Sequence, residues 1–182
     1  MESVTSFRSY DVPLSMSPER LVEPVKTAMA VRASNLMVTR GIVSDTLPER
    51  PGNFEMGLQQ IAMPFGAGMS FQTVKCPNAY TIISNSGGFS RSGTTQSDNY
   101  TACLYPYREG TRVHIVVVST TTHRDGLTGM VNSAVKKGLV GSNEDAAERS
   151  LDKIAEKLST LVPGAELIKS SKVSEPGGIL PR

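Results

Sequence analysis

Apolar residues recur at helical spacing in two parts of the chain. Near the start, Ser17 is a good N-cap and Pro18 suits the first helical position, and an apolar face follows at Leu21, Val25, Ala28 and Met29. In the last third, Asp125 can cap one apolar stripe, and Ser142 opens a second with Ala147, Leu151, Ile154, Leu158 and Leu161. The pattern therefore predicts one N-terminal helix and two C-terminal helices.

Between these helices, strand-like segments alternate with clusters of Gly, Pro and Asn. The clearest signal is a hairpin, in which residues 100–107 and 112–119 flank a turn where we expect Gly110 to adopt a positive φ. The second strand of this hairpin is apolar on both faces, which predicts a central position in a sheet. Further strands are expected at 36–43, 54–63, 69–74 and 80–84, with a short edge strand at 165–168.

This order of elements predicts an α+β fold. We expect an antiparallel sheet of about five to six strands, with one N-terminal helix and two C-terminal helices packed on it. A chain of 182 residues suits one domain. Both ends are polar and without pattern, so we expect a flexible N-terminal segment at 1–11, a single domain at 12–169 and a flexible C-terminal tail at 170–182. Strand-helix-strand alternation is absent, which argues against a doubly wound nucleotide-binding fold.

Charge and hydropathy narrow the classes of partner. The 19 basic and 17 acidic residues leave a formal net charge of +2, and no run of Lys or Arg would follow a phosphate backbone. We therefore expect no nucleic-acid partner. No stretch approaches the ~20 apolar residues of a membrane-spanning helix, and the N-terminus lacks the apolar core of a signal peptide. The chain as given is expected to be soluble. Whether it is a mature form from which a signal peptide has been cleaved is left open by the sequence.

The two cysteines, Cys76 and Cys103, are the most informative pair in the sequence. A zinc site would need both of them to converge with His114 and His123, so we expect no metal and no cofactor. A disulfide would close a loop of about 28 residues and stabilise the fold by roughly 3.5 kcal/mol. We expect this disulfide, and an oxidising compartment with it. Two buried thiols in a reducing cytosol are the alternative.

No complete catalytic motif is present. The segment 88–93 approaches a nucleophile elbow but lacks its second glycine, and 66–68 lacks the lysine of a phosphate-binding loop. Cys103 and His114 would lie close across the predicted hairpin, as a thiol nucleophile and its base do, with His123 as another candidate base. A disulfide at Cys103 would remove this option, so we expect no catalytic residues.

One polar stretch, Ser84–Asn99, is long for a connection in a compact domain. We interpret it as a loop, either a flexible connection or a recognition loop that displays Phe89 and Arg91. Tyrosines that follow it would either pack the sheet or form an amphipathic binding surface beside the loop, and these are Tyr100, Tyr105 and Tyr107.

The stretch TACLYPYREGTRVHIVVVS, at residues 101–119, followed by the C-terminal helices, resembles small uncharacterised lipoproteins of Gram-negative envelopes. Their soluble domains begin with a strand-helix-strand unit like residues 12–43 and end in a helix such as 146–161. The resemblance implies a periplasmic or outer-membrane-associated location, another envelope protein as partner, and binding or assembly without an established reaction. The chain has no lipobox and no N-terminal cysteine, so membrane attachment would depend on a lipid anchor removed from the sequence given.

Three hypotheses of function follow. The leading one is a non-catalytic, periplasm-facing binding or scaffold domain. The second is a small thiol-dependent hydrolase or transferase that uses Cys103 with His114 or His123. The third is a secreted protein that binds a target through residues 84–99. The ligand and the oligomeric state are left open by the sequence.

Overall fold

The computed structural model describes residues 2–13, 16–41, 46–61, 69–85, 89–91, 94–123 and 143–173. The N-terminal half contains β1 (Glu2–Pro13), α1 (Pro18–Met29), β2 (Met37–Arg40), β3 (Glu55–Ile61), β4 (Met69–Lys75) and β5 (Tyr80–Asn85). The C-terminal half contains β6 (Phe89–Arg91), β7 (Thr94–Tyr107), β8 (Gly110–His123), α3 (Asn143–Leu161) and β9 (Glu166–Val173).

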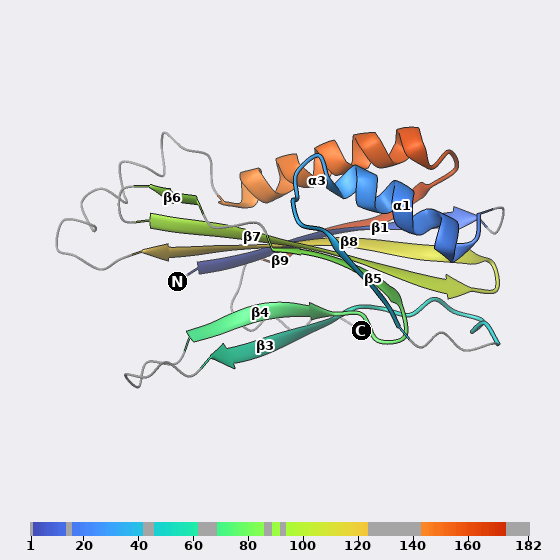
Figure 1. Ribbon diagram of the computed structural model, residues 1–182, viewed down its shortest axis with the longest axis horizontal. Coiled ribbons are helices and arrows are strands. Elements are labelled where there is room, and N and C mark those ends of the chain that lie inside the picture. The colour runs from blue at the N-terminus through green and yellow to red at the C-terminus, as the bar shows by residue number, and fades with distance from the viewer. Residues whose placement is uncertain are drawn as a thin grey trace.

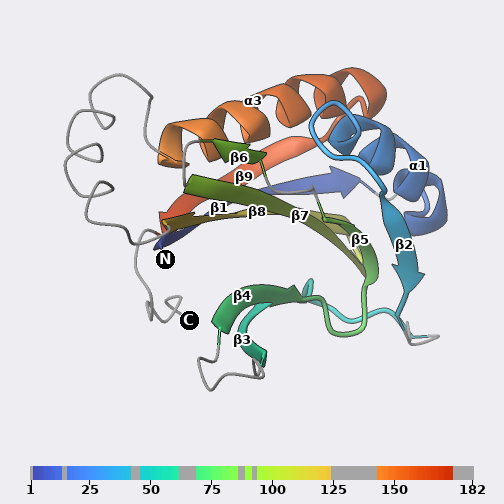
Figure 2. The ribbon, with the colours of Figure 1, turned by 60° about the vertical axis from the view of Figure 1, so that its left-hand side comes forward.

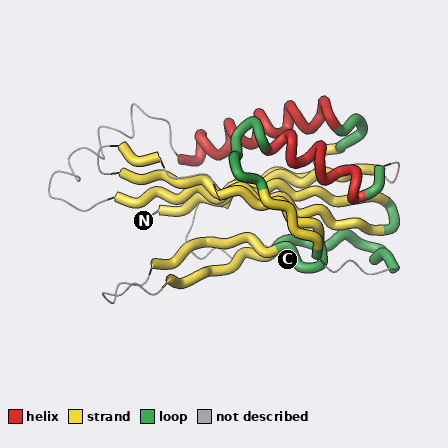
Figure 3. The backbone as a smooth tube through the Cα atoms, in the orientation of Figure 1, coloured by secondary structure: helices red, strands yellow, loops and turns green. Residues whose placement is uncertain are grey.

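A seven-stranded antiparallel sheet forms the middle of the molecule. Its strand order is β2-β5-β7-β8-β1-β9, and the short β6 pairs with β7. Helices α1 and α3 cover one face of this sheet, whereas the two-stranded β3-β4 hairpin lies against the other face (Figures 1 and 2). The molecule therefore has three layers, with helices and hairpin on opposite sides of the sheet (Figure 3).

The alternation of side chains along β8 supplies both buried faces. Val113, Ile115 and Val117 belong to the core beneath the helices, while Val116 and Val118 belong to a second core beneath the hairpin. Because β8 lies between β7 and β1, its predicted central position is confirmed. The helix layer meets this sheet with residues that are almost completely buried, namely Leu21, Val25, Leu151, Ile154 and Leu158.

The predicted fold class is wrong in its arrangement of elements. The first element is a strand and not a helix, the main sheet has seven strands, and β3 and β4 form a separate two-stranded sheet. The described residues contain two helices, α1 and α3. The third predicted helix, which would begin at Asp125, lies outside the described residues.

The expected flexible segment at 1–11 is also wrong, because β1 occupies residues 2–13 and pairs with β8 on one side and β9 on the other. Its polar residues misled the interpretation, since they resemble a solvated tail. In the structure they have partners in three other elements: Thr5 donates to Gln72 of β4 at 2.8 Å, Ser9 bonds His114 of β8 at 2.7 Å, and Arg8 pairs with Asp152 of α3. The polar residues of β1 therefore bond a neighbouring strand of the sheet as well as the hairpin and helix layers on its two faces.

The predicted β7-β8 hairpin is confirmed, but the reason for Gly110 is different from the one expected. Among the described glycines the positive φ belongs to Gly164, and Gly110 pairs with both Tyr107 and Pro13. A Cβ at Gly110 would lie 2.2 Å from the carbonyl oxygen of Val12. Close approach of β1 therefore requires this glycine.

The predicted loop Ser84–Asn99 is wrong over most of its described length. Its first two residues end β5, residues 89–91 form β6, and residues 94–99 begin β7. Residues 86–88 and 92–93 are outside the described residues, as are 174–182 of the predicted tail, whereas 170–173 lie in β9. Neither of the two helices that the structure describes is long and apolar enough to cross a membrane.

Candidate functional site

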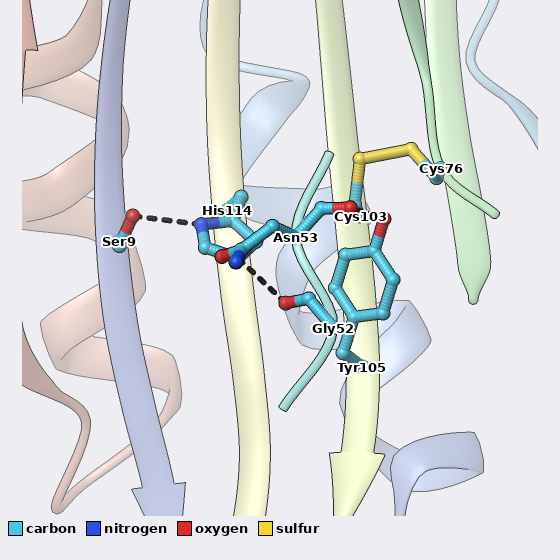
Figure 4. Close-up of a disulfide and its surroundings, with 7 residues drawn as sticks. All are labelled: Ser9, Gly52, Asn53, Cys76, Cys103, Tyr105 and His114. Carbon is cyan, nitrogen blue, oxygen red and sulfur yellow. Dashed lines mark hydrogen bonds between the residues drawn. A yellow bond between two sulfur atoms is a disulfide. The ribbon is translucent and has the colours of Figure 1, made fainter. Parts of the chain in front are cut away.

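Cys103 and His114, the residues considered as a nucleophile and its base, lie beneath the β3-β4 hairpin. Cys76, directly after β4, and Cys103, in β7, form a disulfide with an S–S distance of 2.03 Å and a Cα–Cα distance of 5.5 Å (Figure 4). This confirms the predicted pairing. Cys103 is completely buried, and its strand β7 lies inside the main sheet. The disulfide therefore links the end of β4 in the hairpin to the middle of the main sheet.

His114, in β8, is directly opposite Cys103 in the β7-β8 ladder. Its ring is held at both nitrogens: Nδ1 lies 2.7 Å from the Ser9 hydroxyl, and Nε2 lies 3.3 Å from the carbonyl oxygen of Gly52 (Figure 4). A carbonyl oxygen only accepts, so Nε2 carries the proton and donates it to Gly52. In the neutral ring Nδ1 is then the acceptor, and the Ser9 hydroxyl donates to it. This arrangement fits a neutral imidazole.

Burial keeps the His114 ring neutral. The side chain is 4% exposed, and the ring meets Phe54 and Tyr105 edge to face, with centroid distances of 5.3 Å and 5.7 Å. Burial lowers the pKa of His114 to about 4, although the bond to the Gly52 carbonyl acts in the opposite direction. A ring with this pKa and both nitrogens engaged serves as a structural element of the second core.

The neighbouring Ser9 and His114 have the contact distance of a nucleophile and its base, but they are closed to substrate. Ser9 is 2% exposed, and Phe54 covers the ring from the segment that leads into β3. Phe54 also packs edge to face on Phe7 of β1, with centroids 5.2 Å apart. Sequence patterns missed Ser9 and Gly52 as partners, because each lies more than sixty residues from His114 in the chain.

The disulfide removes the thiol chemistry considered above. Cys103 has no titrating thiol, so the predicted proximity of Cys103 and His114 yields no nucleophile and base pair. His123 ends β8 opposite Thr94, and its side chain lies outside the described residues. Among the described residues, no group of His, Cys, Asp and Glu has the geometry of a metal site.

The three candidate tyrosines do not form one surface. Tyr100 belongs to the core beneath the helices, whereas Tyr105 belongs to the core beneath the hairpin. The Tyr105 hydroxyl donates to the carbonyl oxygen of Asn53 at 2.8 Å, and burial raises the pKa of Tyr105 (Figure 4). Tyr107 is 7% exposed, and burial, followed by the charge of Asp11, raises its pKa. All three contribute to packing.

Phe89 and Arg91, the other candidates for a binding surface, lie in β6. They pair with Gln96 and Thr94 of β7, so their backbone belongs to the sheet. Their side chains lie outside the described residues.

An open hollow of about 350 Å³ lies where β1 ends and β9 begins. Asp11 in its wall is paired with Arg112, whose Nε and Nη2 donate to the two carboxylate oxygens at 2.6 Å and 2.9 Å. The remaining lining residues include two exposed carboxylates and a backbone turn, and they are Val12, Pro13, Tyr107, Glu109, Gly164 and Glu166. The negative charge of this hollow disfavours anions.

A scan against protein-family models, a search of curated proteins and a search of solved structures each find no match to this chain.

Proposed function

We propose that this chain is a non-catalytic binding or scaffold domain that works in an oxidising compartment of the bacterial envelope. The observation that carries the proposal is that Cys103 and His114, the two candidate catalytic side chains that the structure describes, both have structural roles. Cys103 is bonded to Cys76, and both nitrogens of the buried His114 ring are engaged.

The disulfide supports the proposal of an oxidising compartment. Such a bond persists outside the reducing cytosol, where glutathione does not hold cysteines as thiols. It also supports a passive role, because it fixes the hairpin against the sheet on the side where a substrate would have to reach Ser9 and His114. The resemblance of residues 101–119 to envelope lipoproteins agrees with this location and with a role in binding or assembly.

The compartment is tested by the thiol state in cells. Cells that express the chain from its native locus are quenched in acid, denatured and alkylated without reductant, and the mass of the chain is then measured. We expect no alkyl group until a reductant is added. A Cys76→Ser variant is the matched control, since its single Cys103 thiol must take one label. Two labels on the wild-type chain would contradict the proposal.

The absence of catalysis is tested with chromogenic ester, thioester and amide substrates. We expect Ser9→Ala and His114→Gln to have the same background rate as the wild-type chain, because neither residue meets substrate. Ser9→Ala removes the hydroxyl that bonds the ring while it leaves the ring in place. Turnover by the wild-type chain that both variants lose would contradict a non-catalytic role.

A further inference from the structure

The two edges of the main sheet differ in how they resist pairing with another strand. At β9, the register against β1 shifts between Ser9 and Tyr10, so the exposed Ile168 sits at a bulge, and Lys169 follows it. A bulge and an edge lysine are the usual means of blocking strand addition. At β2 the register against β5 is unbroken over all four residues, which are all exposed and contain no proline. Within the part of the chain that the structure describes, no strand pairs with the outer side of β2, so this edge is open.

The direction of the free backbone groups on β2 follows from one hydrogen bond. The Gly41 N–H donates to the Ala79 carbonyl at 3.0 Å, and these two residues are opposite each other when the β2-β5 register is continued. In an antiparallel ladder, residues that bond the partner alternate with residues that point away from it. Thr39 and Met37 therefore bond β5, while the N–H and C=O groups of Val38 and Arg40 point outward.

The side chains along this edge define what would fit beside it. Val38 is 42% exposed on the helix side, and Met37, 72% exposed, lies opposite Ile83 on the hairpin side. These positions favour apolar neighbours. Arg40 is 71% exposed at its side chain; its guanidinium lies 5.5 Å from the Tyr80 ring centroid and 4.0 Å from a Glu19 oxygen. A guanidinium has five N–H donors, and the Glu19 carboxylate is shared with the Tyr80 hydroxyl, which donates to it at 2.5 Å. Arg40 therefore has donors left for a second carboxylate.

We propose that β2 is the docking edge for an extended segment of a partner protein, which adds to the sheet antiparallel to β2. Main-chain hydrogen bonds to Val38 and Arg40 supply the affinity, and the side chains supply the preference. Read in the partner's own direction, the segment has an acidic residue opposite Arg40, any residue next, and apolar residues opposite Val38 and Met37. This inference rests on the proposed binding function and assigns its site.

A second copy of this chain fits the edge less well. Symmetric pairing centred on Val38 would place Leu36 opposite Arg40, which offers no carboxylate to the guanidinium. Pairing of two four-residue edges would also bury less surface than the ~1,200 Å² that a stable protein interface buries. A single extended segment needs much less area, since its backbone bonds do most of the work.

The test uses the oxidised, full-length chain and fluorescent peptides. The probe contains Glu-Thr-Val-Val between flexible ends, and its counterparts carry Lys in place of Glu or the same residues in scrambled order. Val38→Pro removes an outward N–H without removing a bond to β5, as proline at an edge strand allows. Arg40→Glu reverses the charge, and Lys169→Glu makes the same reversal on the opposite edge.

We expect saturable binding of the Glu peptide, weakened about tenfold or more for the Lys and scrambled peptides. Val38→Pro should lose about tenfold in affinity, Arg40→Glu should prefer the Lys peptide, and Lys169→Glu should behave as wild type. No saturable binding, equal binding by Val38→Pro, or self-association through β2 would each overturn the assignment. Any of these results leaves the proposed non-catalytic function intact, because thiol state and turnover test that separately.

Discussion

The two faces of the main sheet are covered by different means. On one face, two helices bury a large and mainly apolar cluster that includes Leu21, Ile154 and Leu158. On the other, a two-stranded hairpin covers a smaller cluster that contains a disulfide and is bordered by His114. An isolated hairpin is marginally stable because it buries little apolar surface. The comparison indicates that a covalent bond and buried polar contacts hold the hairpin where apolar area is insufficient.

The largest expected effect lies on the helix face. Ile154 is completely buried, so Ile154→Ala should lower the free energy of unfolding by about 4 kcal/mol through lost apolar contact and a residual cavity. Chemical denaturation should show this loss in a single global transition. Leu58→Ala on β3 is the matched control, because Leu58 is 71% exposed and should change stability by less than about 0.5 kcal/mol. Equal losses would contradict the distinction.

The hairpin face should be more sensitive to acid. The folded pKa of His114 is about 4 against 6.5 for a free ring, so the unfolded chain binds more protons between these values. The stability contributed by the neutral ring is complete above pH ~6.5 and is lost as the pH falls to about 4, by about 3 kcal/mol in total. Unfolding measured across this range should have a shallower pH dependence in His114→Gln. An unchanged slope would show that His114 is not buried neutral.

The smallest effect concerns the middle of strand β4 in the hairpin. The Gln72 side-chain oxygen accepts from the hydroxyls of Thr5 at 2.8 Å and Ser3 at 3.3 Å. Gln72→Ala should therefore cost about 1 kcal/mol, since it leaves the buried Thr5 hydroxyl without this acceptor. Thr73→Ala provides the comparison, because its hydroxyl contacts Gly57 within the hairpin at 3.4 Å. A larger loss in Thr73→Ala would mean that these contacts between layers do not hold the hairpin.

Local signals in the sequence were sufficient for several elements. Ser17 and Pro18 marked the start of α1, helical spacing marked α3, and the apolar run marked β8. Only Cys76 and Cys103 were available to pair, so the disulfide also followed from the sequence. The helices and the strand depend on residues that are close together in the chain, and the disulfide had one possible pair of cysteines.

The layers and the site depended on contacts between distant residues. Strand β1 looked like a tail because its hydroxyls and Arg8 match partners in β4, β8 and α3, which no local pattern reveals. Ser9 and Gly52 around His114 were missed for the same reason. That β2 is an open edge follows from strand order, and strand order was not contained in the periodicity of Met37–Arg40.

Amide hydrogen exchange on a Cys76→Ser, Cys103→Ala double variant tests the account most directly. If the disulfide holds the hairpin on the sheet, β3 and β4 should lose protection while α1, α3 and β8 keep theirs. Unchanged protection in β3 and β4, or an equal loss in every element, would contradict the claim that the two faces are held by different means.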